Sequence, residues 1–79
     1  MVRLKNIKKS DSAIECDILP EDSEQMGHVV VGAGSGELLE YNLPAGYEWC
    51  RNHVNHAQDE LLKLLNERDM PNEKVVMWY

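Results

Sequence analysis

The sequence predicts a single α+β domain, in which a mainly antiparallel sheet carries one long helix on one face, in the order β-β-β-β-α-β. Three observations predict this fold. Residues 2–43 hold short apolar runs separated by turn residues, residues 47–68 carry one apolar stripe at helical spacing, and the chain closes on a short apolar run. A chain of 79 residues suits one domain, and a sheet with a helix across one face buries a single helical stripe.

The first strand is expected at residues 2–9. Ile7 is out of phase with Leu4, so we expect a bulge or twist near residues 5–6. The polar residues that follow, 9–12, predict a turn.

The second strand is expected at residues 13–19, because its side chains alternate between an apolar and a polar face. Pro20 should end it, since proline cannot donate to the hydrogen-bond ladder. The first strand is basic and this one is acidic, so we expect opposite charges to face each other across the pair. The alternative is a weak nucleic-acid contact through the basic strand. The basic residues concerned are Arg3, Lys5, Lys8 and Lys9.

Residues 27–31 and 37–43 predict a β-hairpin, since the five residues between them, 32–36, are rich in glycine. In the second of these strands the apolar side chains share one face. We expect that face to be formed by Leu39, Tyr41 and Leu43.

The helix is expected at residues 47–68, with a start as early as Pro44. Pro71 should end it by about residue 70, because a residue before proline avoids the α region. The core-facing stripe at 100° per residue consists of Tyr47, Cys50, Val54, Ala57, Leu61, Leu64 and Leu65.

The last strand is expected at residues 73–79. Its unbroken apolar run suggests that both faces are covered or that one face is adhesive. Trp78 and Tyr79 end the chain, and two such aromatics either complete the core or contact another chain. An open edge here would allow a two-fold homodimer by sheet extension.

Composition favours a cytoplasmic protein. The net charge of −6 disfavours binding to phosphate backbones and to anionic membranes. No apolar run is long enough for a membrane span, and the N-terminal residues do not resemble a signal peptide. The two cysteines, Cys16 and Cys50, are too few for a small domain that depends on several disulfide bonds for its stability. We therefore expect both to be reduced and partly buried.

Three potential metal ligands, Cys50, His53 and His56, follow one another at spacings of three in the helix. Their directions diverge around the axis, whereas a zinc pair on a helix prefers i and i+4. We expect a core cysteine with histidines at the rim and surface, and hence no metal or cofactor. The alternative is a metal- or small-ligand-binding module on this face, with Cys16 as a further ligand.

A second stripe of the helix consists of Trp49, His53, His56 and Glu60, along one flank of the core face. One interpretation is that Trp49 folds over the sheet edge and closes the core. The other is a contact surface for a partner or a second copy, since tryptophan is enriched at interface hot spots. We predict no catalytic residue, because Cys50 points toward the core, where burial opposes thiolate formation.

Several segments resemble a family of short bacterial proteins of unknown function. They are residues 4–9, Trp49-Cys50 with His53-Val54, and Pro71 before the run 74–79. The resemblance implies a small bacterial protein and transfers no functional residue. The function we expect is therefore protein interaction, either with another protein or as a homodimer, rather than enzymatic catalysis.

Overall fold

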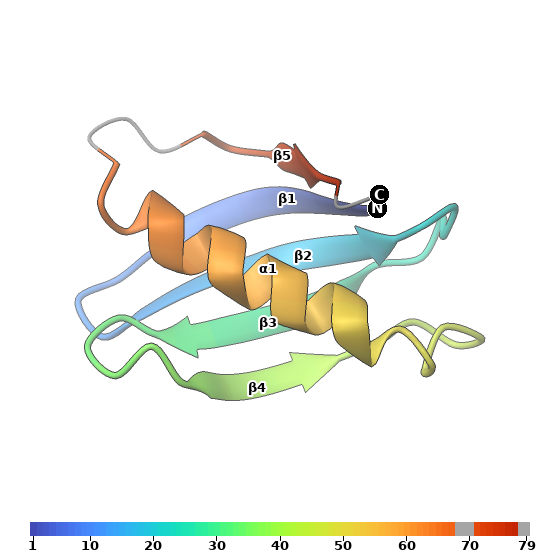
Figure 1. Ribbon diagram of the computed structural model, residues 1–79, viewed down its shortest axis with the longest axis horizontal. Helices are drawn as coiled ribbons and strands as arrows, with labels where there is room; N and C mark the ends of the chain where they lie inside the picture. The colour runs from blue at the N-terminus through green and yellow to red at the C-terminus, as the bar shows by residue number, and fades with distance from the viewer. Residues whose placement is uncertain (68–70, 78–79) are drawn as a thin grey trace.

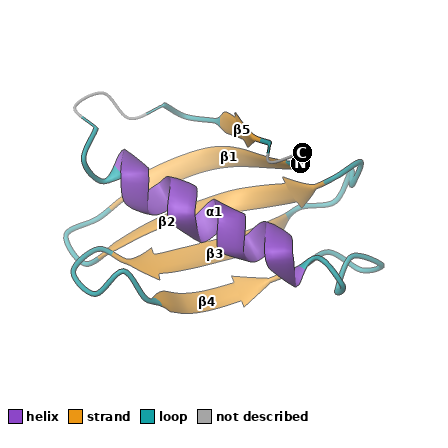
Figure 2. Cartoon of the chain, in the orientation of Figure 1, coloured by secondary structure: helices purple, strands orange, loops and turns teal. Residues whose placement is uncertain are grey.

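The structure, a computed structural model, describes residues 1–67 and 71–77. In that part of the chain five strands and one helix follow one another in the predicted order, so the fold class is confirmed (Figures 1 and 2). The elements are β1 (Val2–Lys9), β2 (Ala13–Pro20), β3 (Gly27–Gly32), β4 (Leu38–Asn42), α1 (Arg51–Leu64) and β5 (Lys74–Val76).

The sheet has the strand order β4-β3-β2-β1-β5, and all neighbouring strands are antiparallel. The first four strands form a meander. The chain then crosses one face as α1 and returns to pair β5 with the free edge of β1 (Figure 1). One face of the sheet is therefore covered by the helix, and the other is open. Among the described residues, no helix has the length and apolar character needed to cross a membrane.

The pairing of β1 with β2 contains the predicted bulge, as the register shifts between Lys5 and Lys8. Asn6 takes a φ of 53° there and donates from Nδ2 to Asp17 Oδ2 at 2.8 Å. The basic and acidic strands face each other as expected, with Lys5 opposite Asp17 and Lys8 opposite Glu15. Pro20 is the last residue of β2, one position later than predicted.

The β3–β4 hairpin is confirmed, but the expected phase of its second strand is wrong at Leu39. Tyr41, which pairs with the buried Val29, and Leu43, which packs against the core, share the covered face. The register shifts where Leu38 pairs with Val31 and Glu40 pairs with Val30, which leaves Leu39 as the extra residue. An extra residue in one strand switches the face of the sheet to which the side chains on one side of it point. Leu38 consequently packs against the core, whereas Leu39 is 56% exposed.

The helix is shorter than predicted at both ends. It begins at Arg51 rather than near residue 47. Gly46, with a φ of 87°, excludes a start as early as Pro44, and Cys50, with φ −85° and ψ 37°, lies outside the helical region directly before Arg51. Cys50 occupies the N-cap position without a side-chain hydrogen bond. At the other end the amides of Asn66 and Glu67 bond three residues back, to Lys63 and Leu64, so the last turn tightens.

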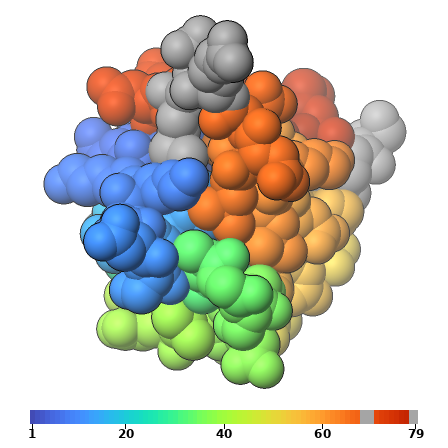
Figure 3. Space-filling model, turned by 90° about the vertical axis from the view of Figure 1, so that its left-hand side faces the viewer, coloured from blue at the N-terminus to red at the C-terminus, as the bar shows by residue number. Residues whose placement is uncertain are grey.

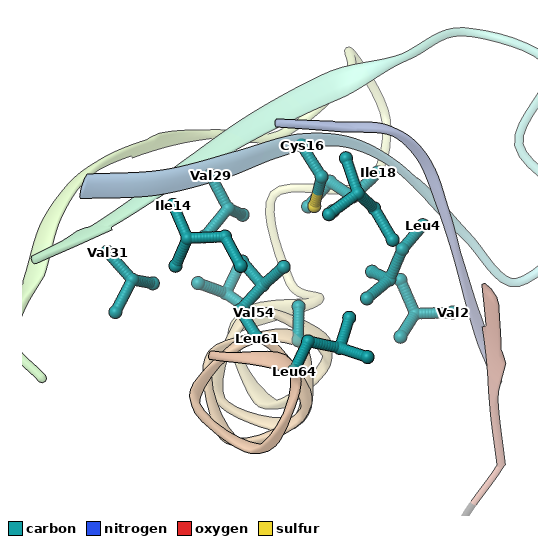
Figure 4. Packing of buried hydrophobic residues seen from close by; sticks show 12 residues of the cluster. Val2, Leu4, Ile14, Cys16, Ile18, Val29, Val31, Val54, Leu61 and Leu64 are labelled. Atoms are coloured by element: carbon teal, nitrogen blue, oxygen red, sulfur yellow. The ribbon is translucent and has the colours of Figure 1, made fainter. Parts of the chain in front are cut away.

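The core lies between the helix and the covered face of the sheet, and the predicted stripe faces it (Figure 4). Leu61 and Leu64 on the helix lie against strand residues such as Ile14 and Leu4. Of the predicted stripe, Tyr47 and Leu65 are only partly buried. The remaining stripe residues are buried, and these are Cys50, Val54, Ala57, Leu61 and Leu64.

Strand β5 covers three residues, fewer than the seven predicted. Val76 pairs with Val2 and packs against the core, whereas Val75 is 53% and Met77 66% exposed. The apolar run is thus covered on one face only. Trp78 and Tyr79 lie outside the described residues, so their predicted role stays a prediction.

Replacing Leu61 should destabilise the fold far more than replacing Leu39. Leu61→Ala removes a fully buried side chain between helix and sheet and should lower the free energy of unfolding by about 2–5 kcal/mol. Leu39→Ala makes the same chemical change at an exposed position and should cost less than about 1 kcal/mol. Urea denaturation measures both, and equal losses would contradict the assignment of the core.

Candidate protein-contact surface

The segment between β4 and α1 brings two aromatic side chains to one end of the molecule. It folds as successive turns, in which the amide of Tyr47 donates to Pro44 O and the amide of Cys50 donates to Tyr47 O, both at 2.9 Å. This end also carries the β2–β3 loop, to the right in Figure 1. We call Tyr47 and Trp49 the aromatic surface.

Trp49 is 67% exposed, so the interpretation that it closes the core is wrong. Its position is nevertheless fixed by three contacts. The indole Nε1–H donates to Gly46 O at 3.1 Å, the ring stacks on Tyr47 with 6.3 Å between centroids, and its edge-to-face contact with His53 has a centroid distance of 5.8 Å. Trp49 is therefore an exposed aromatic held in one orientation.

His53 lies behind Trp49 and is buried, not at the rim as predicted. Its Nε2 is 2.7 Å from Glu21 Oε1, and the same oxygen accepts a hydrogen bond from the amino group of Met1 at 3.0 Å. A carboxylate 32 residues away in sequence thus partners Nε2 of the imidazole, which offsets part of the cost of burying it. This pair gives Trp49 a rigid support.

The predicted flank of the helix does not continue as one exposed stripe. Glu60 is buried, because its Oε1 forms an ion pair with Lys74 Nζ of β5. His56 is partly buried. Trp49 is the most exposed of the four flank residues, and the contacts of His53 and Glu60 lie within the chain.

A shallow groove of about 330 Å³ lies next to Tyr47, between the β2–β3 loop and the β4–α1 segment. Tyr47 Oη donates to Asp22 Oδ1 at 2.7 Å across it. That hydrogen bond, together with desolvation and the negative charge of Asp22, raises the pKa of Tyr47. We call this the acidic groove, and it is lined by Asp22, Ser23, Glu24, Gln25, Ala45 and Tyr47.

Both cysteines are free and buried. Burial, with the charges of Asp17 and Glu15, raises the pKa of Cys16 to about 12. Burial, with the charge of Glu21, also raises the pKa of Cys50. Thiols in this state are poor nucleophiles and poor metal ligands at neutral pH.

The described part of the chain contains no group of three or more histidine, cysteine, aspartate or glutamate side chains that could hold a metal ion. The alternative of a metal module on Cys50, His53 and His56, with Cys16, therefore has no support in the arrangement of those residues.

A polar cluster on the open face of the sheet was not anticipated. His28 Nδ1 lies 2.9 Å from Asp17 Oδ1, and His28 Nε2 lies 3.6 Å from Glu15 Oε2. Partial burial lowers the pKa of His28, but hydrogen bonds to the two carboxylates outweigh it and the pKa is raised overall. Hydrogen bonds from Asn6 and His28 lower the pKa of Asp17. The alternation of β2 places both carboxylates on one face, but only the register with β3 places His28 between them.

Comparison with protein-family models, with curated proteins and with solved structures finds no match. The resemblance to short bacterial proteins therefore stays a prediction.

The His28 cluster predicts a pH-dependent contribution to stability. Because the pKa of His28 is raised from 6.5, its contribution is fully present below that pH and is lost as the pH rises through the folded-state value. His28→Gln should therefore lower the free energy of unfolding more at about pH 5.5 than at about pH 8.5, by a few tenths to about 1 kcal/mol for so exposed a pair. Denaturation of both proteins at the two pH values measures this, and a larger loss at the higher pH would contradict it.

Proposed function

We propose that this protein is a small protein-interaction domain that contacts its partner through the aromatic surface, Tyr47 and Trp49. The observation that carries the proposal is that Trp49 is 67% exposed and yet held by a hydrogen bond and two ring contacts. Tryptophan and tyrosine are, with arginine, the side chains most enriched at the energetic centres of protein interfaces.

Exposing the large aromatic side chain of Trp49 to water costs free energy, and the fold does not need Trp49 to close its core. The core is closed by the helix stripe that starts at Cys50, one residue after Trp49. Burying Trp49 against a partner would recover the free energy of removing apolar surface from water, about 25 cal/mol per Å². Since the ring is already fixed, little side-chain entropy would be lost on binding.

A contact through side chains fits the molecule better than extension of the sheet. The edge strand β5 pairs over only three residues. The other edge strand, β4, carries a bulge at Leu39, and an antiparallel pairing centred on Glu40 would place two like charges opposite each other. We therefore propose a different protein as the partner, with a second copy of this chain as the alternative.

The basic strand supports a nucleic-acid contact less well than the aromatic surface supports a protein contact. Lys5 and Lys8 lie opposite the carboxylates of Asp17 and Glu15 in the sheet. Arg3 donates from Nη2 to Ser23 O at 2.9 Å. Two of the four basic side chains of β1, Lys5 and Lys8, thus lie opposite negative charges within the chain.

Replacing Trp49 should abolish partner capture and leave the fold intact. In crosslinking from cells that express the protein, Trp49→Ala should reduce the amount of a specific partner about tenfold or more, the effect of losing an interface hot spot. Leu39→Ala is the matched control, because it also truncates a large exposed apolar residue but lies near Gly32, away from the aromatic surface.

The same variants are compared by urea denaturation and by light scattering. Trp49→Ala should change the free energy of unfolding by less than about 1 kcal/mol. The proposal fails if capture is equal for Trp49→Ala and Leu39→Ala, or if Trp49→Ala destabilises the fold as much as Leu61→Ala. If light scattering gives a dimer mass for the wild type and a monomer mass for Trp49→Ala, the partner is a second copy of this chain rather than a different protein.

A further inference from the structure

We infer that Glu21 is a positioning residue for the aromatic surface, because its carboxylate orients His53, and His53 holds Trp49 in the orientation that a partner contacts. Glu21 acts through His53 and is not part of the aromatic surface itself. The inference deepens the proposed function and rests on it, since it names the residue on which the fixed orientation of Trp49 depends.

The backbone of Glu21 has a conformation that glutamate seldom adopts. Glu21 follows Pro20, the last residue of β2, and takes a φ of 51°. This left-handed region favours glycine, asparagine and aspartate. The other such residue besides glycine in the described part of the chain is Asn6, which belongs to the favoured types. A turn at residue 21 alone would be served better by one of those residues, so the presence of glutamate points to a use of its longer side chain.

The side chain of Glu21 reaches from the end of β2 to the first turn of α1. Its Oε1 lies 2.7 Å from His53 Nε2 and accepts a hydrogen bond from the Met1 amino group at 3.0 Å. A carboxylate accepts and does not donate, so Nε2 of His53 carries its proton toward Glu21. His53 is only 6% exposed, so water competes little for this hydrogen bond. The contact therefore fixes the rotation of the imidazole ring.

The contact with His53 ties Trp49 to the core, which its other two contacts do not do. Gly46 and Tyr47 belong to the same surface segment as Trp49 and can move together with it. His53 instead lies in α1 and is buried. Its ring meets the indole at 90° with 5.8 Å between centroids, so a rotation of the imidazole changes the surface that supports the indole. The orientation of Trp49 thus depends on the hydrogen bond that Glu21 makes.

Glu21 also brings a negative charge to the start of α1, and this second effect has to be separated from the first. The helix has no acidic residue in its first turn, and its N-cap residue makes no side-chain hydrogen bond. The charge of Glu21 acts at this point, because burial and then that charge raise the pKa of Cys50. A carboxylate near a helix N-terminus stabilises the helix whether or not it orients His53.

Two conservative variants of the full chain separate the contact from the charge. Glu21→Asp keeps the charge and suits a positive φ, but its side chain is one methylene shorter and loses the contact with His53. Glu21→Gln keeps the length, and its amide oxygen still accepts from Nε2–H, but the charge is lost. Neither change removes a buried apolar side chain, so both proteins should fold.

Nitrogen-15 relaxation of the Trp49 indole N–H measures the orientation of the ring without a partner. Glu21→Asp should lower the order parameter from about 0.85 toward about 0.6, and Glu21→Gln should leave it unchanged. Asp22→Ala is the matched control, because it removes the neighbouring carboxylate and its exposed hydrogen bond with Tyr47. It should lower the order parameter less than Glu21→Asp does.

Crosslinking of the same variants in cells measures the consequence for the proposed function. Glu21→Asp should reduce partner capture about threefold, since a surface that holds the competent orientation for about a third of the time binds that much more weakly. Glu21→Gln should capture the partner as the wild type does. The reverse order, with a loss in Glu21→Gln and none in Glu21→Asp, would show that the charge matters and would overturn the inference.

The outcomes also separate this inference from the proposed function. If Trp49→Ala abolishes capture but Glu21→Asp changes neither capture nor the order parameter, the aromatic surface is a contact site and Glu21 does not position it. A fall of the order parameter in Asp22→Ala as large as in Glu21→Asp would likewise overturn the inference. If Trp49→Ala leaves capture unchanged, the proposed function fails, whatever the order parameters of the Glu21 variants.

Discussion

The packing of one helix stripe on one face of the sheet is the constraint on which the rest of this structure depends. A helix of 14 residues is marginal alone in water, so α1 is stabilised chiefly by burying its apolar side. The opposite wall is the covered face of the sheet, with residues such as Ile14, Cys16 and Ile18 (Figure 4). At the far end the β3–β4 loop lies against the C-terminal half of the helix, where Gln58 donates to Gly36 O at 2.9 Å (Figure 3).

The same constraint explains why Trp49 is exposed. The buried stripe begins at Cys50, and the positive φ of Gly46 places a turn directly before it. Trp49 lies between Gly46 and Cys50, and its indole N–H donates a hydrogen bond to the Gly46 carbonyl oxygen. The imidazole of His53, buried on Glu21, supports the ring from behind. The aromatic surface is thus a consequence of how the helix starts, and its rigidity comes from the core beneath it.

Local patterns predicted the elements, and contacts distant in sequence decided the site. The period-two strands, the glycine-rich hairpin turn and the bulge in β1 follow from neighbouring residues, and so does the helix stripe. The helix start was missed because no serine, threonine, aspartate or asparagine caps it, so the sequence carries no cap signal there. The burial of His53 and Glu60 depends on Glu21 and Lys74, and the acidic groove exists only because two loops distant in sequence lie side by side.

The central claim is that Trp49 is exposed and yet held in one orientation, as a contact surface requires. Nitrogen-15 relaxation of the Trp49 indole N–H in the free protein tests it most directly, with the signal assigned by Trp49→Phe. The account predicts an order parameter close to that of rigid backbone, about 0.85. A value below about 0.6 would mean that the ring moves freely on the surface, and the aromatic surface would then lose the preorganisation on which the proposed function rests.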